Sequence, residues 1–457
     1  MITETELEAL SFRDAPRMLT STVPGAAGQR RLDTSLKYES MARGGGAFPF
    51  VFERGFGVTV TDPDGNLYID LSAGVAVSSV GRCHPRVVEV IHRQSRELMH
   101  ASDISNTRRG ELAERLAGIA PAGLRGNCVT YFTQSGSDAV EAAVKFAKRI
   151  TGRQQIIAFH GAYHGVWNAS NALTTGAQYR DGYGPFMGGV IHAPYPYTYR
   201  FPFDTTYKSA EQLAGEYVDY LLNTPYTAAN DVAAVVVEPV QGEGGYVAPD
   251  ATFLQLLRRA CDKSGALLIV DEIQAGAGRT GQMWASEYSN VESDMLTFGK
   301  GLGGDLPMAG VIMRAEFTKQ IPAGSQPGTF AANALSAAVC LTNIELLQDA
   351  QSDLLGRARV LGEEAKQTIR DSSLSIIGEI RGRGLMIGIE LVEDRSTKTP
   401  LGADRIESLV MKCLQRGVVM FPCGRYGNVL RIMPSLTIPR SYLRVALGIV
   451  LDEMHQA

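Results

Sequence analysis

The sequence predicts an α/β protein in which a mostly parallel sheet lies between layers of helices, followed by a smaller α+β domain. Between about residues 76 and 330, short β-branched runs alternate with helical patterns, as in repeated strand–helix–strand units. Several of these runs are followed at once by a glycine-rich or polar cluster. Because ligands of parallel sheets bind beyond the carboxyl ends of the strands, a functional site is expected at that edge.

Composition places the chain among ordinary globular proteins. Its 457 residues suffice for two domains, and 45% hydrophobic and 20% charged residues are typical values. The formal net charge of −4 gives no reason to expect a nucleic-acid partner. No apolar run reaches the ~18 residues of a membrane span, and the acidic N-terminus lacks the features of a signal peptide. Six scattered cysteines without a CxxC pair predict buried thiols in a reducing cytoplasm and no metal site.

The chain divides into three predicted parts. Residues 1–75 form an N-terminal arm with one or two short helices, a turn at Gly44–Gly46 and a hairpin over residues 58–70 that joins the small domain. Residues 76–330 form the large domain, and residues 331–457 the small C-terminal domain. Helices are expected over residues 335–349 and 441–454, with strands within 378–392 and 418–438. The strands expected in the large sheet are residues 128–132, 155–159, 233–237, 266–270, 295–298 and 308–313.

Lys300 follows one of these buried strands and lies in a glycine-rich turn. A buried ammonium must be paired or neutralised, and the flanking glycines let a bulky group approach the backbone. Schiff-base formation, with a carbonyl substrate or with pyridoxal phosphate, is the chemistry that needs such an amine. No P-loop pattern ends here, which excludes that alternative, whereas the ten residues around Lys300 do not by themselves exclude a surface lysine.

Carboxylates end two other apolar strands. Asp271 could keep a pyridine nitrogen protonated, so that the ring becomes an electron sink; a salt bridge or a helix cap is the alternative. Glu238 and Glu243 lie beside three glycines, which is less common than a lone glutamate at a strand end.

Two further strand ends suit a phosphate and a flat ring. Gly136 and Ser137 begin a helix, with Ser137 as the expected cap, and could cradle a phosphate, although taken alone an ordinary N-cap is favoured. Tyr163, between glycines, could stack on a heterocycle or simply pack in its loop. His164 is expected to be structural, because no second ligand or carboxylate lies at a useful spacing.

Taken together, these motifs resemble the class III pyridoxal-phosphate aminotransferases, the ornithine and 4-aminobutyrate type, of fold type I. The resemblance runs from about residue 50 to 450. It rests on SGSDAVEAA, GAYHG, VVEPVQGEGG, IVDEIQAGAGRTG, FGKGLGGDLPMAG, GTFAANALS, RGRGLMIGIEL and VLRIMPSLTI, in the order found in the family. It implies a seven-stranded sheet in the large domain, pyridoxal 5′-phosphate as cofactor, and a homodimer with composite sites.

The resemblance also implies residue roles. Lys300 would form the Schiff base and move the substrate proton, and Asp271 would pair with the pyridine nitrogen. Arg431 would take the α-carboxylate of an amino acid, and Glu243 would pair with Arg431 when the bound end has no carboxylate. The other cofactor positions implied are Gly136 and Ser137 at the phosphate, Thr329 from the second subunit, Tyr163 and Ile273 on the ring faces, Gln274 at the ring hydroxyl, and Glu238.

One departure bears on the substrate. Family members that act on 4-aminobutyrate carry an arginine after Tyr-His-Gly, where this chain has Val166, so 4-aminobutyrate is expected to be a poor substrate. The aromatic stretch 195–203 is expected to form a rim that suits an apolar amine or an amino sugar equally.

The leading hypothesis is an aminotransferase that moves an amino group from a small-molecule donor such as glutamate to an aldehyde or ketone. A sugar aldehyde in amino-sugar biosynthesis is one such acceptor. A racemase or epimerase on the same scaffold is the alternative, and it needs a second proton carrier that no motif reveals. A non-catalytic binding protein is disfavoured, because Lys300, Asp271 and Gln274 are all retained.

Overall fold

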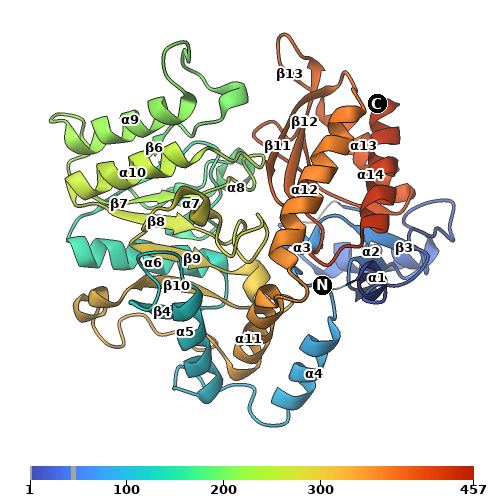
Figure 1. Ribbon diagram of the computed structural model, residues 1–457, viewed down its shortest axis with the longest axis horizontal. Coiled ribbons are helices and arrows are strands. Elements are labelled where there is room, and N and C mark those ends of the chain that lie inside the picture. The colour runs from blue at the N-terminus through green and yellow to red at the C-terminus, as the bar shows by residue number, and fades with distance from the viewer. Residues whose placement is uncertain (1–2, 43–47, 457) are drawn as a thin grey trace.

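A computed structural model describes residues 3–42 and 48–456, and the predicted turn at residues 44–46 lies outside this part. The described residues form three β-sheets and the helices that cover them (Figure 1). No helix in this part of the chain is both long enough and apolar enough to cross a membrane.

The largest sheet has seven strands, as the family resemblance implied. All neighbouring strands run parallel except β10, which is antiparallel to both of its neighbours. The six predicted strands are present with ends within one residue of those expected, whereas β6 was not predicted. In sheet order the strands are β4 (Cys128–Thr133), β10 (Ala309–Arg314), β9 (Met295–Phe298), β8 (Leu267–Asp271), β7 (Val232–Val237), β5 (Gln155–Phe159) and β6 (Val190–Ala193).

Helices cover both faces of this sheet. On β5, residues 157 and 159 face a core shared with α9 (Ala210–Asn223) and α10 (Ala251–Ser264), whereas residues 156 and 158 face a core shared with α6 (Gly136–Thr151) and α7 (Asn168–Leu173). Successive side chains of a strand point to opposite faces, so a strand covered on both faces must be apolar throughout. This is why the predicted strands are continuous β-branched runs.

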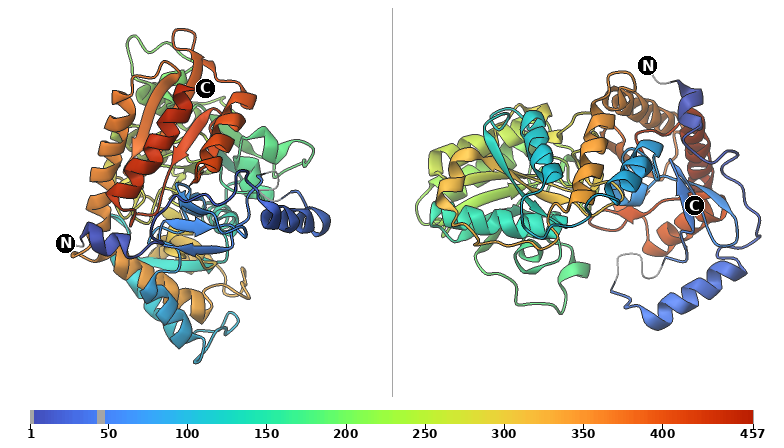
Figure 2. Two further views of the ribbon diagram at one scale, coloured as in Figure 1. Left: turned by 90° about the vertical axis from the view of Figure 1, so that its right-hand side faces the viewer. Right: turned by 90° about the horizontal axis from the view of Figure 1, so that it is seen from below.

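Two smaller sheets lie beside the large one. The predicted hairpin is confirmed as β2 (Thr59–Thr61) and β3 (Leu67–Asp70), with β1 (Arg54–Phe56) on one side and the C-terminal β14 (Val418–Val419) on the other. The third sheet contains β11 (Ile377–Arg383), β12 (Met386–Asp394), β13 (Thr399–Pro400), β15 (Pro422–Cys423) and β16 (Val429–Ile432). Figures 1 and 2 show the N-terminal strands next to the C-terminal helices.

The third sheet is covered by α12 (Leu354–Asp371), α13 (Ala403–Gln415) and α14 (Arg440–His455) (Figure 1). The two helices predicted in this part of the chain are α11 (Ala334–Gln348) and α14, and the ends of both lie within one residue of the prediction. The domain limits at residues 75 and 330 stay a prediction. The remaining helices are α1 (Glu4–Glu8), α2 (Ala26–Tyr38), α3 (Ala73–Ala76), α4 (Pro85–Gln94), α5 (Thr107–Ile119), α8 (Ala177–Arg180), and the 3₁₀ turns η1 (Thr198–Arg200), η2 (Ala285–Ser289), η3 (Lys300–Leu302) and η4 (Ala315–Gln320).

Candidate active site

The carboxyl ends of β4, β5, β7, β8 and β9 meet around a cavity of about 150 Å³, called here the lysine cavity. Eight of the predicted cofactor positions line it, which places residues from distant parts of the sequence within one small volume. The lining residues are Ser135, Gly136, Ser137, Tyr163, His164, Gly165, Glu238, Asp271, Ile273, Gln274 and Lys300.

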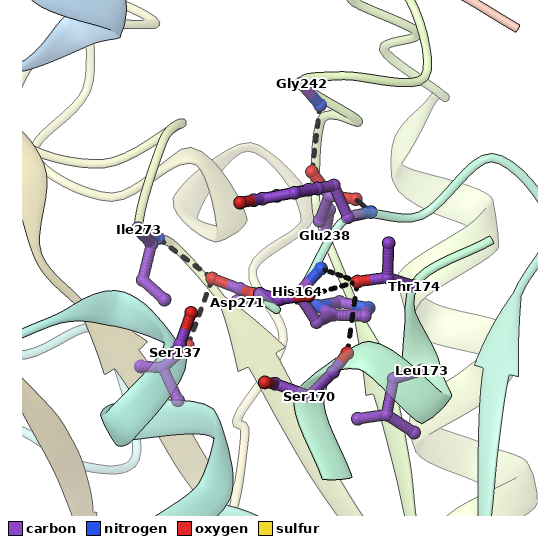
Figure 3. A network of polar contacts seen from close by, with 12 residues as sticks. Ser137, His164, Ser170, Leu173, Thr174, Glu238, Gly242, Asp271 and Ile273 are labelled. Carbon is purple, nitrogen blue, oxygen red and sulfur yellow. Dashed lines mark hydrogen bonds and ion pairs between the residues drawn. The ribbon is translucent and has the colours of Figure 1, made fainter. Parts of the chain in front are cut away.

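Asp271 lies at the centre of a hydrogen-bond network at the end of β8 (Figure 3). Its Oδ1 accepts from the backbone N–H of Ile273 and from the hydroxyl of Thr297, both at 3.1 Å. Its Oδ2 lies 2.7 Å from Nδ1 of His164. Thr297 faces Asp271 in the β8–β9 register and is the polar residue of an otherwise apolar strand. A carboxylate held by three donors has a fixed orientation, which suits it to pair with a cationic group.

His164 lines the lysine cavity and is hydrogen-bonded to Asp271, and its being structural rather than a metal ligand or a base stays a prediction. Its side chain is 0% exposed, and burial alone would lower its pKa. The hydrogen bond and charge of Asp271 outweigh burial and raise the pKa of His164. Thr174 accepts from the backbone N–H of His164 at 2.9 Å and helps to fix this loop. No carboxylate lies near His164 in sequence, which is why spacing did not reveal the pair.

Lys300 begins η3 directly after β9, as predicted, and its backbone has a φ of +41°. A lysine in this left-handed region is strained, and such strain occurs mainly where function requires it. Desolvation lowers the pKa of Lys300, although the charges of Glu243 and Asp271 oppose this effect. The amine is therefore more readily neutral, and hence nucleophilic, than that of an exposed lysine.

Glu238 is a buried carboxyl group held by the backbone of two loops. Its oxygens accept from the N–H groups of Tyr163 at 3.1 Å and Gly242 at 2.8 Å. Desolvation raises the pKa of Glu238 to about 7, with His164 lowering it and Asp271 raising it further. Glu238 thus connects the loop after β5 to the turn that carries Glu243.

The start of α6 offers backbone N–H groups without side-chain obstruction. Ser135, and not Ser137, is the N-cap, because its hydroxyl accepts from Asp138 at 3.3 Å. Gly136 and Ser137 lie in the first turn, and the Ser137 hydroxyl instead accepts from the N–H of Val166 at 3.2 Å. A Cβ at Gly165 would lie 2.4 Å from this hydroxyl, so a side chain there would fill the cradle. Free N–H groups at a helix start favour a phosphate.

Gln274 is only 7% exposed, and its buried amide oxygen has no hydrogen-bond partner among the described residues. Leaving a buried polar atom unsatisfied costs about 1–3 kcal/mol, so such an atom indicates a missing ligand group or water. A Cβ at Gly242 would lie 2.6 Å from this amide, so glycine keeps that side of the cavity open.

Arg431 and Glu243 form an ion pair near Lys300, with Nη1 and Oε1 2.5 Å apart. Both charges contribute to the pKa of Lys300, Glu243 raising it and Arg431 lowering it. Arg431 lies on β16, and its Nη2 also donates to the carbonyl of Pro422 at 3.0 Å. The pair joins the third sheet to the lysine cavity.

Thr329 does not reach the lysine cavity of its own chain. It lines a separate surface cavity of about 360 Å³ together with residues of β4 and the first turn of α6. Its carbonyl lies 2.8 Å from the His100 ring, and the neighbouring Phe330 is 60% exposed. Thr329 is therefore on an exposed surface.

An aromatic pocket of about 420 Å³ lies beside the lysine cavity. Its lining residues are Ala42, Val166, Trp167, Asn168, Asn171, Gln178, Tyr179, Tyr183, Pro185 and Phe186, and none of these described residues is charged. The rings of Tyr163 and Tyr179 meet edge to face at 4.9 Å between the two spaces. The predicted rim at residues 195–203 is not part of either lining, because Tyr195 and Tyr197 are buried and donate to the Glu238 carbonyl and the Glu390 carboxylate.

The carboxyl ends of the strands in the large sheet carry a desolvated lysine, an oriented aspartate and an open helix start. Together with the fold, these features define a pyridoxal-phosphate enzyme of fold type I. Residues 40–453 match the aminotransferase class-III family, and the chain belongs to this family. It is a pyridoxal-phosphate-dependent enzyme of the aminotransferase type, which excludes the non-catalytic hypothesis.

Similar proteins differ in the reactions their names describe. The chain is 35% identical to an alanine/serine racemase of Pyrococcus horikoshii, covering 93% of this chain and 90% of the relative. It is equally 35% identical to a 4-aminobutyrate aminotransferase of Mycobacterium tuberculosis, with coverages of 95% and 97%. Among solved structures, the ornithine aminotransferase of Toxoplasma gondii superposes with a TM-score of 0.81 at 27% identity, covering 94% of this chain and 96% of that one.

The residues of the lysine cavity fit pyridoxal phosphate. The buried Gln274 oxygen lacks a partner, the Gly165 position leaves the start of α6 open, and the pKa of Lys300 is lowered toward a reactive amine. Each feature is costly in an empty protein and useful with this cofactor bound.

Proposed function

We propose that this enzyme transfers an amino group from an amino-acid donor, glutamate in the first instance, to an apolar aldehyde or ketone. The observation that supports this most strongly is the Arg431–Glu243 pair beside Lys300, with its two charged atoms 2.5 Å apart. The proposed transamination needs one site that accepts both a carboxylate-bearing and a carboxylate-free substrate. The Arg431–Glu243 ion pair provides such a site if it breaks when a substrate carboxylate binds Arg431 and forms again when none is bound.

Each cavity residue has a role in this proposal. Pyridoxal phosphate, when bound, supplies the aldehyde that condenses with an amine and a ring that accepts electrons from the substrate Cα. Lys300 would take the proton from the substrate Cα, since its lowered pKa favours the neutral amine. Asp271, oriented by His164 and Thr297, would keep a proton on the ring nitrogen. Gly136 and Ser137 would hold the phosphate, Tyr163 and Ile273 would cover the ring, and Gln274 would contact the ring hydroxyl, with Glu238 as a further cofactor-binding residue.

The Arg431–Glu243 pair selects the substrate end. The α-carboxylate of glutamate binds Arg431 in place of Glu243, because two carboxylates compete for one guanidinium. When the substrate end has no carboxylate, Glu243 returns and neutralises Arg431, whose charge would otherwise be buried without a partner. The same site can therefore serve both half-reactions.

The other end of the acceptor is expected to be apolar. Val166 stands where a cation for a distal carboxylate is expected, and it is 44% exposed on the aromatic pocket. Arg180 is engaged elsewhere, since it donates to the carbonyls of Asn171 and Thr174 at 2.6 and 2.7 Å. The uncharged lining supports an apolar amine or ketone over 4-aminobutyrate, whose single carboxylate would lie in this pocket. Glutamate has the same distal carboxylate, but its α-carboxylate also gains the contact with Arg431.

The proposed assembly is a homodimer in the cytoplasm. Thr329 lies on an exposed surface away from its own lysine cavity, which supports a contribution to the phosphate site of a second subunit. All six cysteines are free, which supports a reducing compartment.

Racemisation is the second candidate, supported by the similarity to the alanine/serine racemase. It needs a proton carrier on the face of Cα opposite Lys300. Desolvation raises the pKa of Tyr163 to about 12, and the Nδ1 atom of His164 is bound to Asp271, so neither is an effective acid there. Transfer of the amino group is therefore preferred.

The test follows the visible absorbance of the cofactor after single amines are added in heavy water without an acceptor. We expect glutamate to bleach the band, and an apolar amine to do so better than 4-aminobutyrate. If the band persists while an amino acid gains deuterium and loses optical activity, the enzyme is a racemase. Robust preference for 4-aminobutyrate would contradict the proposed apolar subsite.

A further inference from the structure

A buried arginine fixes the turn that carries Glu243. Arg381 lies on β11, and its Nε donates to the carbonyl of Gly245 at 2.7 Å. The Gly245 N–H in turn donates to the carbonyl of Gly242 at 3.0 Å, which closes the turn around Glu243. Gly245 has a φ of +114°, and a Cβ there would lie 2.8 Å from Nη2 of Arg381. Only glycine allows the guanidinium to come this close.

Arg381 is itself held by charge and by an aromatic face. Its Nη1 donates to Glu379 and to Glu390, each at 2.6 Å, and Glu390 is 0% exposed. The guanidinium also lies 4.7 Å from the ring centre of Tyr197. A buried carboxylate that loses its partner is costly, so Glu390 keeps the arginine in this position. Tyr197 adds a cation–π contact and donates its hydroxyl to the same carboxylate.

This cluster joins the two large parts of the molecule. Arg381 and Glu390 belong to the third sheet. Tyr197 and Arg200, which both contact the carboxylate of Glu390, come from the chain after β6 of the seven-stranded sheet. A second tie lies on the other side of the turn, where the Gly424 N–H donates to the carbonyl of Glu243 at 2.9 Å. The turn that carries Glu243 is thus held at two points, at the Gly245 carbonyl by Arg381 and at the Glu243 carbonyl by Gly424.

We propose that Arg381 is a positioning residue that sets the strength of the Glu243–Arg431 ion pair, and with it the balance between carboxylate-bearing and carboxylate-free substrates. The proposal rests on the proposed function of that pair. When the tie to Gly245 is lost, Glu243 competes less well for Arg431. A substrate carboxylate then binds more tightly, and a carboxylate-free substrate binds less tightly, because Arg431 is left without its neutralising partner.

The test compares Arg381→Gln with the matched control Arg383→Gln in the cofactor-loaded enzyme. Arg383 lies two residues along the same strand and also donates to a backbone carbonyl, that of Pro249, but it does not touch the Glu243 turn. Calorimetry measures the dissociation constant of glutarate, an unreactive dicarboxylate. Half-reaction kinetics measure KM and kcat for glutamate and for 1-phenylethylamine.

For Arg381→Gln we expect tighter glutarate binding and a higher KM for 1-phenylethylamine, each by at least about fivefold, the lower end of measured couplings between sites. The kcat values should change less, and Arg383→Gln should shift neither constant. Glu390→Gln keeps Arg381 but weakens the ion pair that holds this arginine in place. It should therefore shift both constants in the same directions by smaller factors, and it replaces Arg381→Gln in the test if that variant does not fold. Constants that move in the same direction for both ligands would overturn the proposal.

Glu243→Gln separates this proposal from the function on which it rests. We expect Glu243→Gln to show the same opposite shifts, and the double variant Arg381→Gln/Glu243→Gln to match it, because both changes act through one ion pair. Additive effects would show that Arg381 acts independently of Glu243 and would overturn the positioning role alone. If Glu243→Gln shifts neither constant, the switchable carboxylate site and the role of Arg381 both fail.

Discussion

Replacing His164 with leucine tests whether this histidine orients Asp271. In the folded protein Nδ1 of His164 lies 2.7 Å from Oδ2 of Asp271, and the two side chains are 0% and 4% exposed. A hydrogen bond to a charged group contributes about 1.5–3 kcal/mol, and each 1.4 kcal/mol is about tenfold in an equilibrium or rate constant. The loss should therefore slow the amine half-reaction by about ten- to hundredfold.

His164→Asn is the matched control, because its amide can donate from about the position of Nδ1. Stopped-flow absorbance of the cofactor with a saturating donor measures both variants, and circular dichroism checks their fold. We expect the asparagine variant to keep most of the wild-type rate. Equal losses in the two variants, or a loss below about threefold for leucine, would refute the argument that this hydrogen bond orients Asp271.

Three further predictions concern the same cavity. The raised pKa of His164 means that its pairing stabilises the folded protein fully below the ordinary pKa of about 6.5, and less as pH rises through the folded value. The difference in thermal midpoint between wild type and His164→Asn should therefore be largest below pH 6.5 and shrink above it; a difference that grows with pH would contradict this sign. Lys300→Ala should bind the cofactor, measured by equilibrium dialysis, without the visible band of a lysine-bound aldehyde, and an unchanged spectrum would remove Lys300 from its role. Gly165→Ala should weaken cofactor binding at least about tenfold, since the new Cβ would lie 2.4 Å from the Ser137 hydroxyl. The control is Gly152→Ala, at another positive φ but with no atom within 4 Å of the new Cβ, which should lower stability and leave cofactor binding unchanged.

The fold was predictable because its signals are local. Strands covered on both faces must be apolar throughout, so each appears as a short β-branched run with clear ends. The exception is β6 (Val190–Ala193), whose first three residues are only partly buried and include a histidine. A partly buried run that contains a histidine gives a weaker apolar pattern than a strand covered on both faces.

Two sequence interpretations were wrong for related reasons. Ser135 and Ser137 both suit a helix cap, and the path by which β4 leaves the sheet decides in favour of Ser135. The aromatic stretch at 195–203 has the composition of a substrate rim, yet Tyr197 donates its hydroxyl to the buried Glu390. A tyrosine has the same sequence signal whether its hydroxyl faces a ligand or a carboxylate of its own chain.

By itself the sequence determined which residues could carry the chemistry. A lysine and an aspartate at the ends of apolar strands must find partners or a ligand, and parallel strands bring such ends to one edge. Only the tertiary structure decided how those residues are tuned. His164 and Asp271 are 107 positions apart, and Arg381 acts on Glu243 through a glycine carbonyl 136 positions away. Hydrogen bonds and ion pairs act over about 3 Å of space, and no regularity of a single sequence reports which distant residues come within that distance.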